Sequence, residues 1–176
     1  EMAFATKYGF RKIAIANGRV TINGQRVIFR GVNTQDTHPA HGRSIDVPTM
    51  LRDVTMMKQA NINTVRTSHY PRQAKMNAMF DYYGIYVMDE ADVECHYNWF
   101  YGAKNIMKDE SWRPQFIDRT KRMAVRDRNF PSIIFWSLGN ESGTGANLQA
   151  TYNILKKLDP SRPVHYEGAT RERASY

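Results

Sequence analysis

The segment Ile133-Ile-Phe-Trp-Ser-Leu-Gly-Asn-Glu-Ser142 decides the fold, because an uninterrupted apolar run passes directly into polar residues. A run that is apolar at successive positions is typical of a strand buried on both faces in a parallel sheet. Similar strands, each ending in polar residues, are expected at 63–66, 85–89 and 163–166. Segments with helical spacing separate them, and strands that alternate with helices predict parallel βαβ units.

Helices are expected from Asp46 onward and over residues 73–83, 111–128 and 146–158. Before them, the dipeptides Asn17-Gly18 and Asn23-Gly24 favour hairpin turns, and an apolar strand is expected over 26–33. These elements make about four to five βα units, whereas a closed (β/α)8 barrel has eight and about 250 residues. The sequence therefore predicts an α/β fold: a β-hairpin segment over 1–25, followed over 26–176 by the N-terminal part of a TIM barrel. An open doubly wound sheet is the alternative, but no glycine-rich phosphate loop follows any strand.

Composition and charge exclude two classes of partner. The 176 residues carry a net charge of +8, but the basic residues are dispersed, and the densest stretch, 113–128, also contains Asp118 and Asp127. Such mixed charge is typical of a solvated helix face, and no nucleic-acid-binding motif accompanies it. An apolar run of about 18 residues is also missing, which argues against a membrane span. The single cysteine, Cys95, favours a cytoplasmic protein, with the periplasm as the alternative.

The polar residues after the apolar run suit the hydrolysis of a glycosidic bond. That reaction needs one protonated carboxyl to give a proton to the leaving oxygen, and a second carboxylate to attack or to activate water. Glu141 is the candidate acid, and Asn140 is placed to donate a hydrogen bond to the sugar 2-hydroxyl. The alternative is a Gly-Asn turn with a capping glutamate.

Two further motifs follow predicted strands. Glu94 and His96 are two residues apart at the tip of a strand, so their side chains project to the same side and can share a hard divalent cation with a third carboxylate. His69 follows the strand over 63–66 and, from its sequence context alone, caps the next helix. Tyr166 ends the last strand and is equally consistent with a core aromatic.

Taken together, these motifs make the chain similar to the central domain of family 2 glycoside hydrolases, and within it to the β-galactosidases. The similarity covers about residues 8–168. The motifs that carry it are, in order, Tyr8-Gly-Phe-Arg11, Arg30-Gly-Val-Asn33, Thr37-His-Pro39, Arg66-Thr-Ser-His-Tyr-Pro71, Asp89-Glu-Ala91, Glu94-Cys-His96, Trp136-Ser-Leu-Gly-Asn-Glu-Ser142 and Asp159-Pro-Ser-Arg-Pro-Val164.

The resemblance implies a retaining hydrolase of terminal β-D-galactosides with Glu141 as general acid/base. It implies an active-site Mg²⁺ held by Glu94, His96 and Glu141. It also implies that His69 hydrogen-bonds the sugar and that Tyr166 lies beside the nucleophile.

The chain departs from this pattern in three places, one of which is Tyr97, where a glycine often follows the Glu-x-His motif; residue 97 lies outside the residues that the structure describes. Gln35 replaces a histidine that contacts the sugar, which leaves β-glucuronidase or another sugar specificity as an alternative. The nucleophilic glutamate of the family belongs on a strand beyond residue 176, so we expect residues 1–176 alone to be inactive. The expected partners are a β-galactoside or related carbohydrate and either the remainder of the barrel or a second copy. A non-catalytic carbohydrate-binding or assembly module with unpaired edge strands is the remaining alternative.

Overall fold

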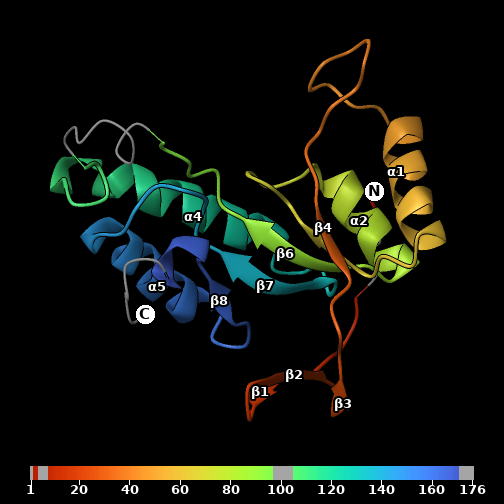
Figure 1. Ribbon diagram of the computed structural model, residues 1–176, viewed down its shortest axis with the longest axis horizontal. Coiled ribbons are helices and arrows are strands. Elements are labelled where there is room, and N and C mark those ends of the chain that lie inside the picture. The colour runs from red at the N-terminus through yellow and green to blue at the C-terminus, as the bar shows by residue number, and fades with distance from the viewer. Residues whose placement is uncertain (1, 4–7, 97–104, 171–176) are drawn as a thin grey trace.

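The computed structural model describes residues 2–3, 8–96 and 105–170, and its main feature is a five-stranded parallel sheet in the order β4-β5-β6-β7-β8 (Figure 1). The strands of this sheet are β4 (Gly31–Asn33), β5 (Thr64–Arg66), β6 (Tyr86–Glu90), β7 (Ile133–Ser137) and β8 (Val164–His165). A separate antiparallel sheet contains β1 (Ile13–Ala16), β2 (Arg19–Ile22) and β3 (Gln25–Arg26). Strands that follow one another in the chain are therefore neighbours in each sheet.

Helices connect the parallel strands. The α-helices are α1 (Val47–Gln59), α2 (Ala74–Tyr83), α4 (Arg113–Asp127) and α5 (Ala146–Leu158), with 3₁₀ turns η1 (Glu110–Trp112) and η2 (Glu167–Thr170). In Figure 1, α1 and α2 lie together at one end of the molecule, whereas α4 and α5 pack side by side at the other end, near β7 and β8. In the part of the chain that the structure describes, no helix is both long and apolar enough to cross a membrane.

The helix boundaries follow from local chemistry. The Asp46 side chain accepts a hydrogen bond of 2.9 Å from the Thr49 backbone N–H and caps the start of α1, as predicted. Gly84 ends α2 in the left-handed conformation with φ 68°, which a glycine adopts without steric cost.

The hydrophobic core lies between the outer face of the sheet and the helices. Val65, Val87 and Trp136 occupy the outward positions of three neighbouring strands, and each is 0% exposed. The Trp136 indole N–H reaches Asp159 Oδ2 at 3.0 Å, so the one polar atom of this large side chain is satisfied. Side chains at the intervening strand positions face the inner side of the sheet.

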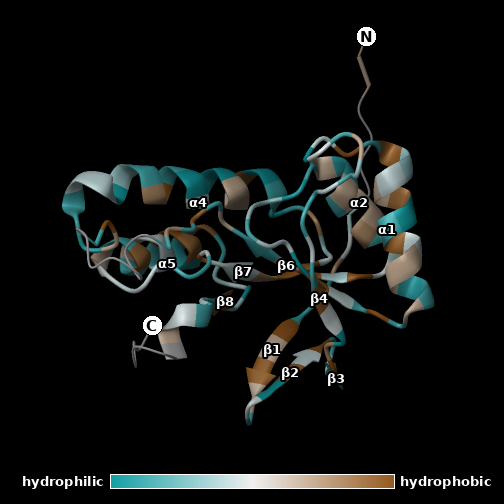
Figure 2. Cartoon of the chain, turned by 45° about the horizontal axis from the view of Figure 1, so that its top comes forward, coloured by the Kyte–Doolittle hydropathy of each residue, from teal (hydrophilic) through white to brown (hydrophobic). Residues whose placement is uncertain are grey.

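The small sheet is a double hairpin built on two type I′ turns. Asn17 and Gly18 have φ of 52° and 68°, and Asn23 and Gly24 have φ of 53° and 80°. These angles match the right-handed twist of the flanking strands, as the Asn-Gly pattern predicted. The sheet extends away from the helices and the parallel sheet (Figures 1 and 2).

The single strand predicted over 26–33 is wrong, because β3 ends at Arg26 and β4 begins only at Gly31. Val27 N–H still bonds Val20 O in the small sheet at 3.1 Å. After Val27, the side chain of Asn63 binds the backbone in place of a neighbouring strand. Its Oδ1 accepts from Arg30 N–H at 2.8 Å, and its Nδ2 donates to Ile28 O at 2.9 Å. An apolar run predicted one strand, but side-chain hydrogen bonds from Asn63 hold the crossing between two sheets.

Five parallel strands in sequential order, with helices between them, are the arrangement of a (β/α)8 barrel over part of its circumference. The predicted α/β class and partial TIM barrel are therefore confirmed. In such barrels, active sites lie at the carboxyl ends of the strands.

Candidate active site

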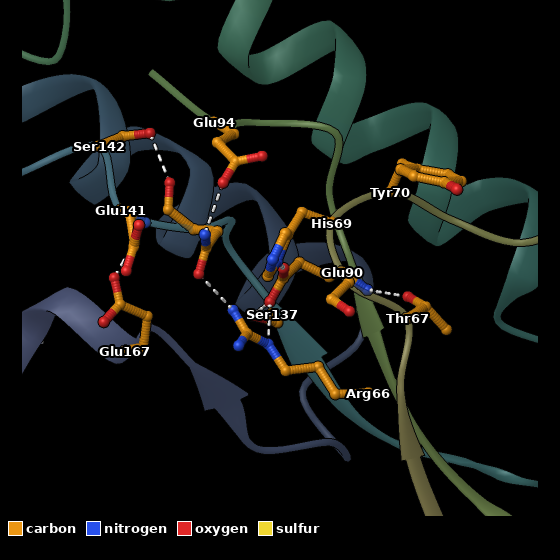
Figure 3. A network of polar contacts seen from close by, with 12 residues as sticks. Arg66, Thr67, His69, Tyr70, Glu90, Glu94, Ser137, Glu141, Ser142 and Glu167 are labelled. Carbon is orange, nitrogen blue, oxygen red and sulfur yellow. Dashed lines mark hydrogen bonds and ion pairs between the residues drawn. The ribbon is translucent and has the colours of Figure 1, made fainter. Parts of the chain in front are cut away.

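The carboxyl ends of β5, β6, β7 and β8 bring polar side chains from distant parts of the sequence together (Figure 3). Arg66 ends β5, Glu90 ends β6 and Ser137 ends β7, and all three meet on the inner side of the sheet. The polar clusters predicted at separate strand ends therefore belong to one site.

A close approach of backbone to backbone shapes the loop after β7. Gly139 has φ 140°, and a Cβ atom at this position would lie 2.4 Å from Val93 O. Asn140 N–H donates to the same Val93 oxygen at 2.9 Å. Ser142 Oγ accepts from Cys95 N–H at 2.7 Å and donates to Asn140 O at 2.7 Å. The Gly139 position thus lets the segment after β6 lie directly against the loop that carries Glu141.

Asn140 is held at both ends of its side-chain amide. Its Oδ1 accepts from Arg66 Nη2 at 2.9 Å, and its Nδ2 donates to Glu94 Oε1 at 2.7 Å. Arg66 can only donate, so this contact fixes which end of the amide carries the oxygen. The Nδ2 group has a second hydrogen, for which the described residues supply no acceptor.

Glu141 has a left-handed backbone with φ 38°, which is unusual for a residue with a side chain. Its N–H donates to Glu167 Oε1 at 2.9 Å, and its side chain is 39% exposed (Figure 3). Strained backbone of this kind is common at functional sites, where surrounding contacts enforce it. The local geometry thus presents the Glu141 carboxylate at the open end of the sheet and does not place it in a helix cap.

Glu94, His96 and Glu141 converge, as the sequence predicted for a cation site. Each offers one ligand atom, and these atoms all lie within 4.8 Å of one another. His96 Nε2 lies 3.1 Å from Glu94 Oε1 and 2.8 Å from Glu141 Oε2. Two carboxylate oxygens and an imidazole nitrogen suit a divalent cation of the Mg²⁺ or Mn²⁺ type. The donor set therefore fits the metal that the family resemblance implies.

Glu90 is a buried carboxylate that organises its neighbours. Its Oε2 accepts from Arg66 Nε at 2.6 Å and from Ser137 Oγ at 2.7 Å, and its Oε1 lies 2.7 Å from His69 Nδ1. The Glu90 side chain is 0% exposed and that of His69 is 18% exposed. His69 therefore binds the Glu90 carboxylate through one ring nitrogen and does not cap α2.

Tyr166 lies in the core, with 6% of its surface exposed. Its hydroxyl accepts from Ser142 N–H at 3.2 Å and donates to Gly143 O at 2.7 Å. These contacts place the predicted sugar-site tyrosine under the loop that carries Glu141. The hydroxyl of Tyr166 therefore supports this loop.

Gln35 is exposed in the turn after β4, between the half-buried Thr34 and the buried Asp36. Thr34 N–H bonds Arg66 O at 3.1 Å, and Ser68 Oγ donates to Thr34 O at 2.8 Å. The turn is therefore held against the segment that leads to His69.

Three polar residues of the inner face, Arg66, Ser137 and His165, were not predicted as site residues. Burial, and then the nearby charge of Arg66, lower the pKa of His165. Arg66 ends a strand that the sequence predicted, whereas the predicted strand over 163–166 ends at Tyr166 and the observed strand β8 ends at His165. Recognising such residues requires the strand registers, which decide whether a residue faces the core or the inner side.

The chain belongs to the glycosyl hydrolases of family 2, because residues 13–175 match the TIM barrel domain of that family. A β-galactosidase of Pectobacterium atrosepticum is 48% identical over 166 residues, which are 94% of this chain and 16% of that enzyme. Residues 1–176 thus correspond to about one sixth of the length of this relative.

Two solved structures have the same fold. A β-D-glucuronidase of Dictyoglomus thermophilum superimposes with a TM-score of 0.82 at 26% identity, over 90% of this chain and 29% of that one. A β-glucuronidase of Ruminococcus gnavus gives a TM-score of 0.82 at 25% identity, over 95% of this chain and 30% of that one. Each of these relatives extends well beyond the segment that this chain covers.

Proposed function

We propose that residues 1–176 supply the acid/base part of the active site of a retaining β-D-galactosidase. The observation that carries the proposal is the presentation of Glu141, whose left-handed backbone is held by Glu167 and whose carboxylate is partly exposed beside Asn140 and His96. Glu141 would protonate the glycosidic oxygen and then take a proton from water as the glycosyl intermediate is hydrolysed. The second carboxylate would come from outside this segment, about 5–5.5 Å from Glu141.

The other residues of the site have defined roles in this proposal. Asn140 would donate its second Nδ2 hydrogen to the sugar 2-hydroxyl, a contact that strengthens in the transition state. His69 and Gln35 would hydrogen-bond other hydroxyls. Tyr166 would keep the loop after Glu141 in place.

Glu94, His96 and Glu141 would hold a Mg²⁺ ion. A bound divalent cation supplies positive charge beside the acid/base carboxylate and the sugar. The chain itself contributes the orientation of these ligands, because Asn140 fixes Glu94 by a hydrogen bond of 2.7 Å. Contacts that orient metal ligands in this way are known to affect metal affinity.

The choice of galactose rests on the 48% identity to the Pectobacterium β-galactosidase. The glucuronidases that share the fold are only 25–26% identical, and they make a β-glucuronide the second candidate substrate. Aryl β-D-galactosides and aryl β-D-glucuronides offered to the intact protein that contains residues 1–176 will distinguish the two. Preferential cleavage of the glucuronide would overturn the galactoside assignment.

The role of Glu141 is tested with leaving groups of different acidity. Glu141→Gln is expected to lower kcat/KM about 10²–10⁴-fold for a poor leaving group, and much less for dinitrophenolate, which departs without protonation. Glu110→Gln is the control, because the Glu110 side chain is 78% exposed and pairs with Arg113 on the protein surface. Equal losses for both leaving groups would show that Glu141 is not the acid. The isolated 176-residue chain is expected to cleave neither substrate.

A further inference from the structure

We infer that His165 is a substrate-specificity residue whose Nε2 accepts a hydrogen bond from one hydroxyl of the bound sugar. The inference rests on the proposed glycosidase function and extends it to a residue that the sequence motifs did not indicate. Three observations support it: the register of strand β8, the hydrogen bond of the His165 ring and the surroundings of its Nε2 atom.

The register places His165 on the inner face of the sheet. Ser137 pairs with His165 across β7 and β8, and Glu90 pairs with Ser137 across β6 and β7. Residues opposite one another in neighbouring strands point to the same face. The alternate positions Trp136 and Val164 face the helices. His165 therefore shares the inner face with Glu90 and Arg66.

Hydrogen bonds define the tautomer of the ring. Ser137 Oγ donates its hydrogen to Glu90 Oε2 at 2.7 Å, because the carboxylate can only accept. The contact of 3.1 Å between Ser137 Oγ and His165 Nδ1 is therefore donated by the imidazole. With the proton on Nδ1, a neutral ring leaves Nε2 as an acceptor. The pKa of His165, lowered by burial and by Arg66, favours this neutral form.

The Nε2 atom is free to meet a ligand. Among the described residues, it makes no hydrogen bond, and it is not among the polar atoms that are both buried and unsatisfied. His69 is tied through its own Nδ1 to the other oxygen of Glu90. One buried carboxylate thus orients two imidazoles, one directly and one through Ser137, at the end of the sheet where Asn140 and Glu141 lie.

The preferred ligand group follows from this chemistry. A neutral Nε2 acceptor binds a hydroxyl, which can donate a hydrogen, whereas a carboxylate at the same place offers only lone pairs. His165 is therefore suited to a neutral sugar. A site that hydrogen-bonds a hydroxyl discriminates strongly against an analogue that lacks it, because the buried partner is left unpaired.

Two variants distinguish the roles of the two ring nitrogens of His165. The amide of Asn in His165→Asn occupies roughly the place of Nδ1, so it preserves the link to Ser137 and removes the far acceptor. The longer side chain in His165→Gln reaches roughly the place of Nε2 and restores an acceptor there. A purely structural role for His165 would be preserved by Asn, whereas a role in recognition would be rescued by Gln.

The test measures kcat/KM of the intact protein containing residues 1–176 on an aryl β-D-galactoside and its monodeoxy analogues. In the unchanged protein and in His165→Gln, removal of the hydroxyl that His165 binds is expected to lower kcat/KM about tenfold or more beyond the loss that His165→Asn shows for the same analogue. For His165→Asn, this extra cost at the same hydroxyl disappears, and the fall for the parent sugar is mainly in KM. If all three proteins lose the same factor at every hydroxyl, the inference about His165 is wrong. If the unchanged protein cleaves no aryl glycoside, it is the proposed function that fails.

Discussion

Asp36 and Arg72 form a buried ion pair that joins the turn after β4 to the turn after β5. Arg72 Nε lies 3.3 Å from Asp36 Oδ1, and the two side chains are 1% and 10% exposed. The same guanidinium donates to Ser68 O at 3.0 Å and Tyr70 O at 3.2 Å, and it also donates to Thr34 O. One side chain therefore holds the segment that carries Gln35 against the segment that carries His69.

Replacing Arg72 by Met is expected to lower the free energy of unfolding by about 3–5 kcal/mol, because it removes the ion pair of the buried Asp36 carboxylate and the donor to the Ser68 and Tyr70 carbonyls. Urea denaturation followed by circular dichroism measures the loss. Arg52→Met is the control, since Arg52 is exposed on α1 and its loss is expected to cost less than about 0.5 kcal/mol. Equal stability of the two variants would contradict a structural role for the Asp36–Arg72 pair.

Gly139 and Gly18 provide a second matched comparison. Both have positive φ, but a Cβ at Gly139 would meet Val93 O at 2.4 Å, whereas nothing lies within 4 Å of a Cβ at Gly18. Gly18→Ala is therefore expected to cost about 1–2 kcal/mol, the usual strain of a left-handed residue. Gly139→Ala adds a backbone clash and is expected to cost at least twice as much, measured by thermal unfolding. Similar melting temperatures for the two variants would show that the loop after β7 can move away from Val93.

The elements that were predictable from the sequence are those with strong local signals. The Asp46 cap and the Gly84 stop define helix ends through interactions within a few residues, and the structure confirms both. The segment 27–30 was not predictable, because its hydrogen bonds come from Asn63, which lies more than 30 residues away along the chain.

Some residues of the candidate site were likewise predictable from the sequence, and others were not. Glu94, His96 and Glu141 were predicted from motif spacing and family resemblance, and the structure brings them together. His165 and Tyr166 are neighbours in the sequence, but the register of β8 turns His165 to the inner face, and Tyr166 lies in the core. The sequence pattern left Tyr166 open between a site residue and a core aromatic, and only the family resemblance favoured the site, because the face to which each of two adjacent side chains points depends on the strand register.

Asp159 is expected to make stability depend on acid pH. Burial alone would raise its pKa, but hydrogen bonds from Ser161, Arg162 and Trp136 and the charge of Arg162 lower it to about 2. Its stabilising contribution is present above pH 4 and is lost as the pH falls from about 4 to 2, because the unfolded carboxyl takes up a proton first. A shift of this size corresponds to about 2 kcal/mol. Denaturation of Asp159→Asn at several pH values should show lower stability at pH 7 and a flatter loss in acid, whereas Asp118→Asn, with a 57% exposed side chain, should follow the unchanged protein.

Asp89 is expected to give stability the opposite dependence on pH, with a loss as the pH rises. Burial, and then the charge and a hydrogen bond of Asp127, raise the pKa of Asp89 well above its ordinary range. The folded protein therefore keeps a proton that the unfolded chain releases above about pH 4, and stability falls as the pH rises toward the folded pKa. Asp89→Asn removes this proton linkage and should flatten the slope by up to about 1.4 kcal/mol per pH unit. Asp92→Asn is the control, because the Asp92 side chain is 61% exposed. If Asp89→Asn leaves the change of stability with pH as it is in the unchanged protein, Asp89 is ionised in the folded protein.

Divalent cation binding is expected to depend on Glu94 and His96 together. Both side chains lie with Glu141 in a cluster whose ligand atoms are within 4.8 Å of one another. Mn²⁺ is a useful probe, because its ligand preferences overlap those of Mg²⁺ and its electron paramagnetic resonance signal weakens on binding. One Mn²⁺ per chain, displaced by excess Mg²⁺, is the expected result. Glu94→Gln and His96→Ala should each weaken binding at least tenfold, whereas Glu110→Gln should not change it. Binding that is equally tight in all three variants would place the cation elsewhere and would leave Glu94, Asn140 and His96 as a hydrogen-bonded frame for Glu141.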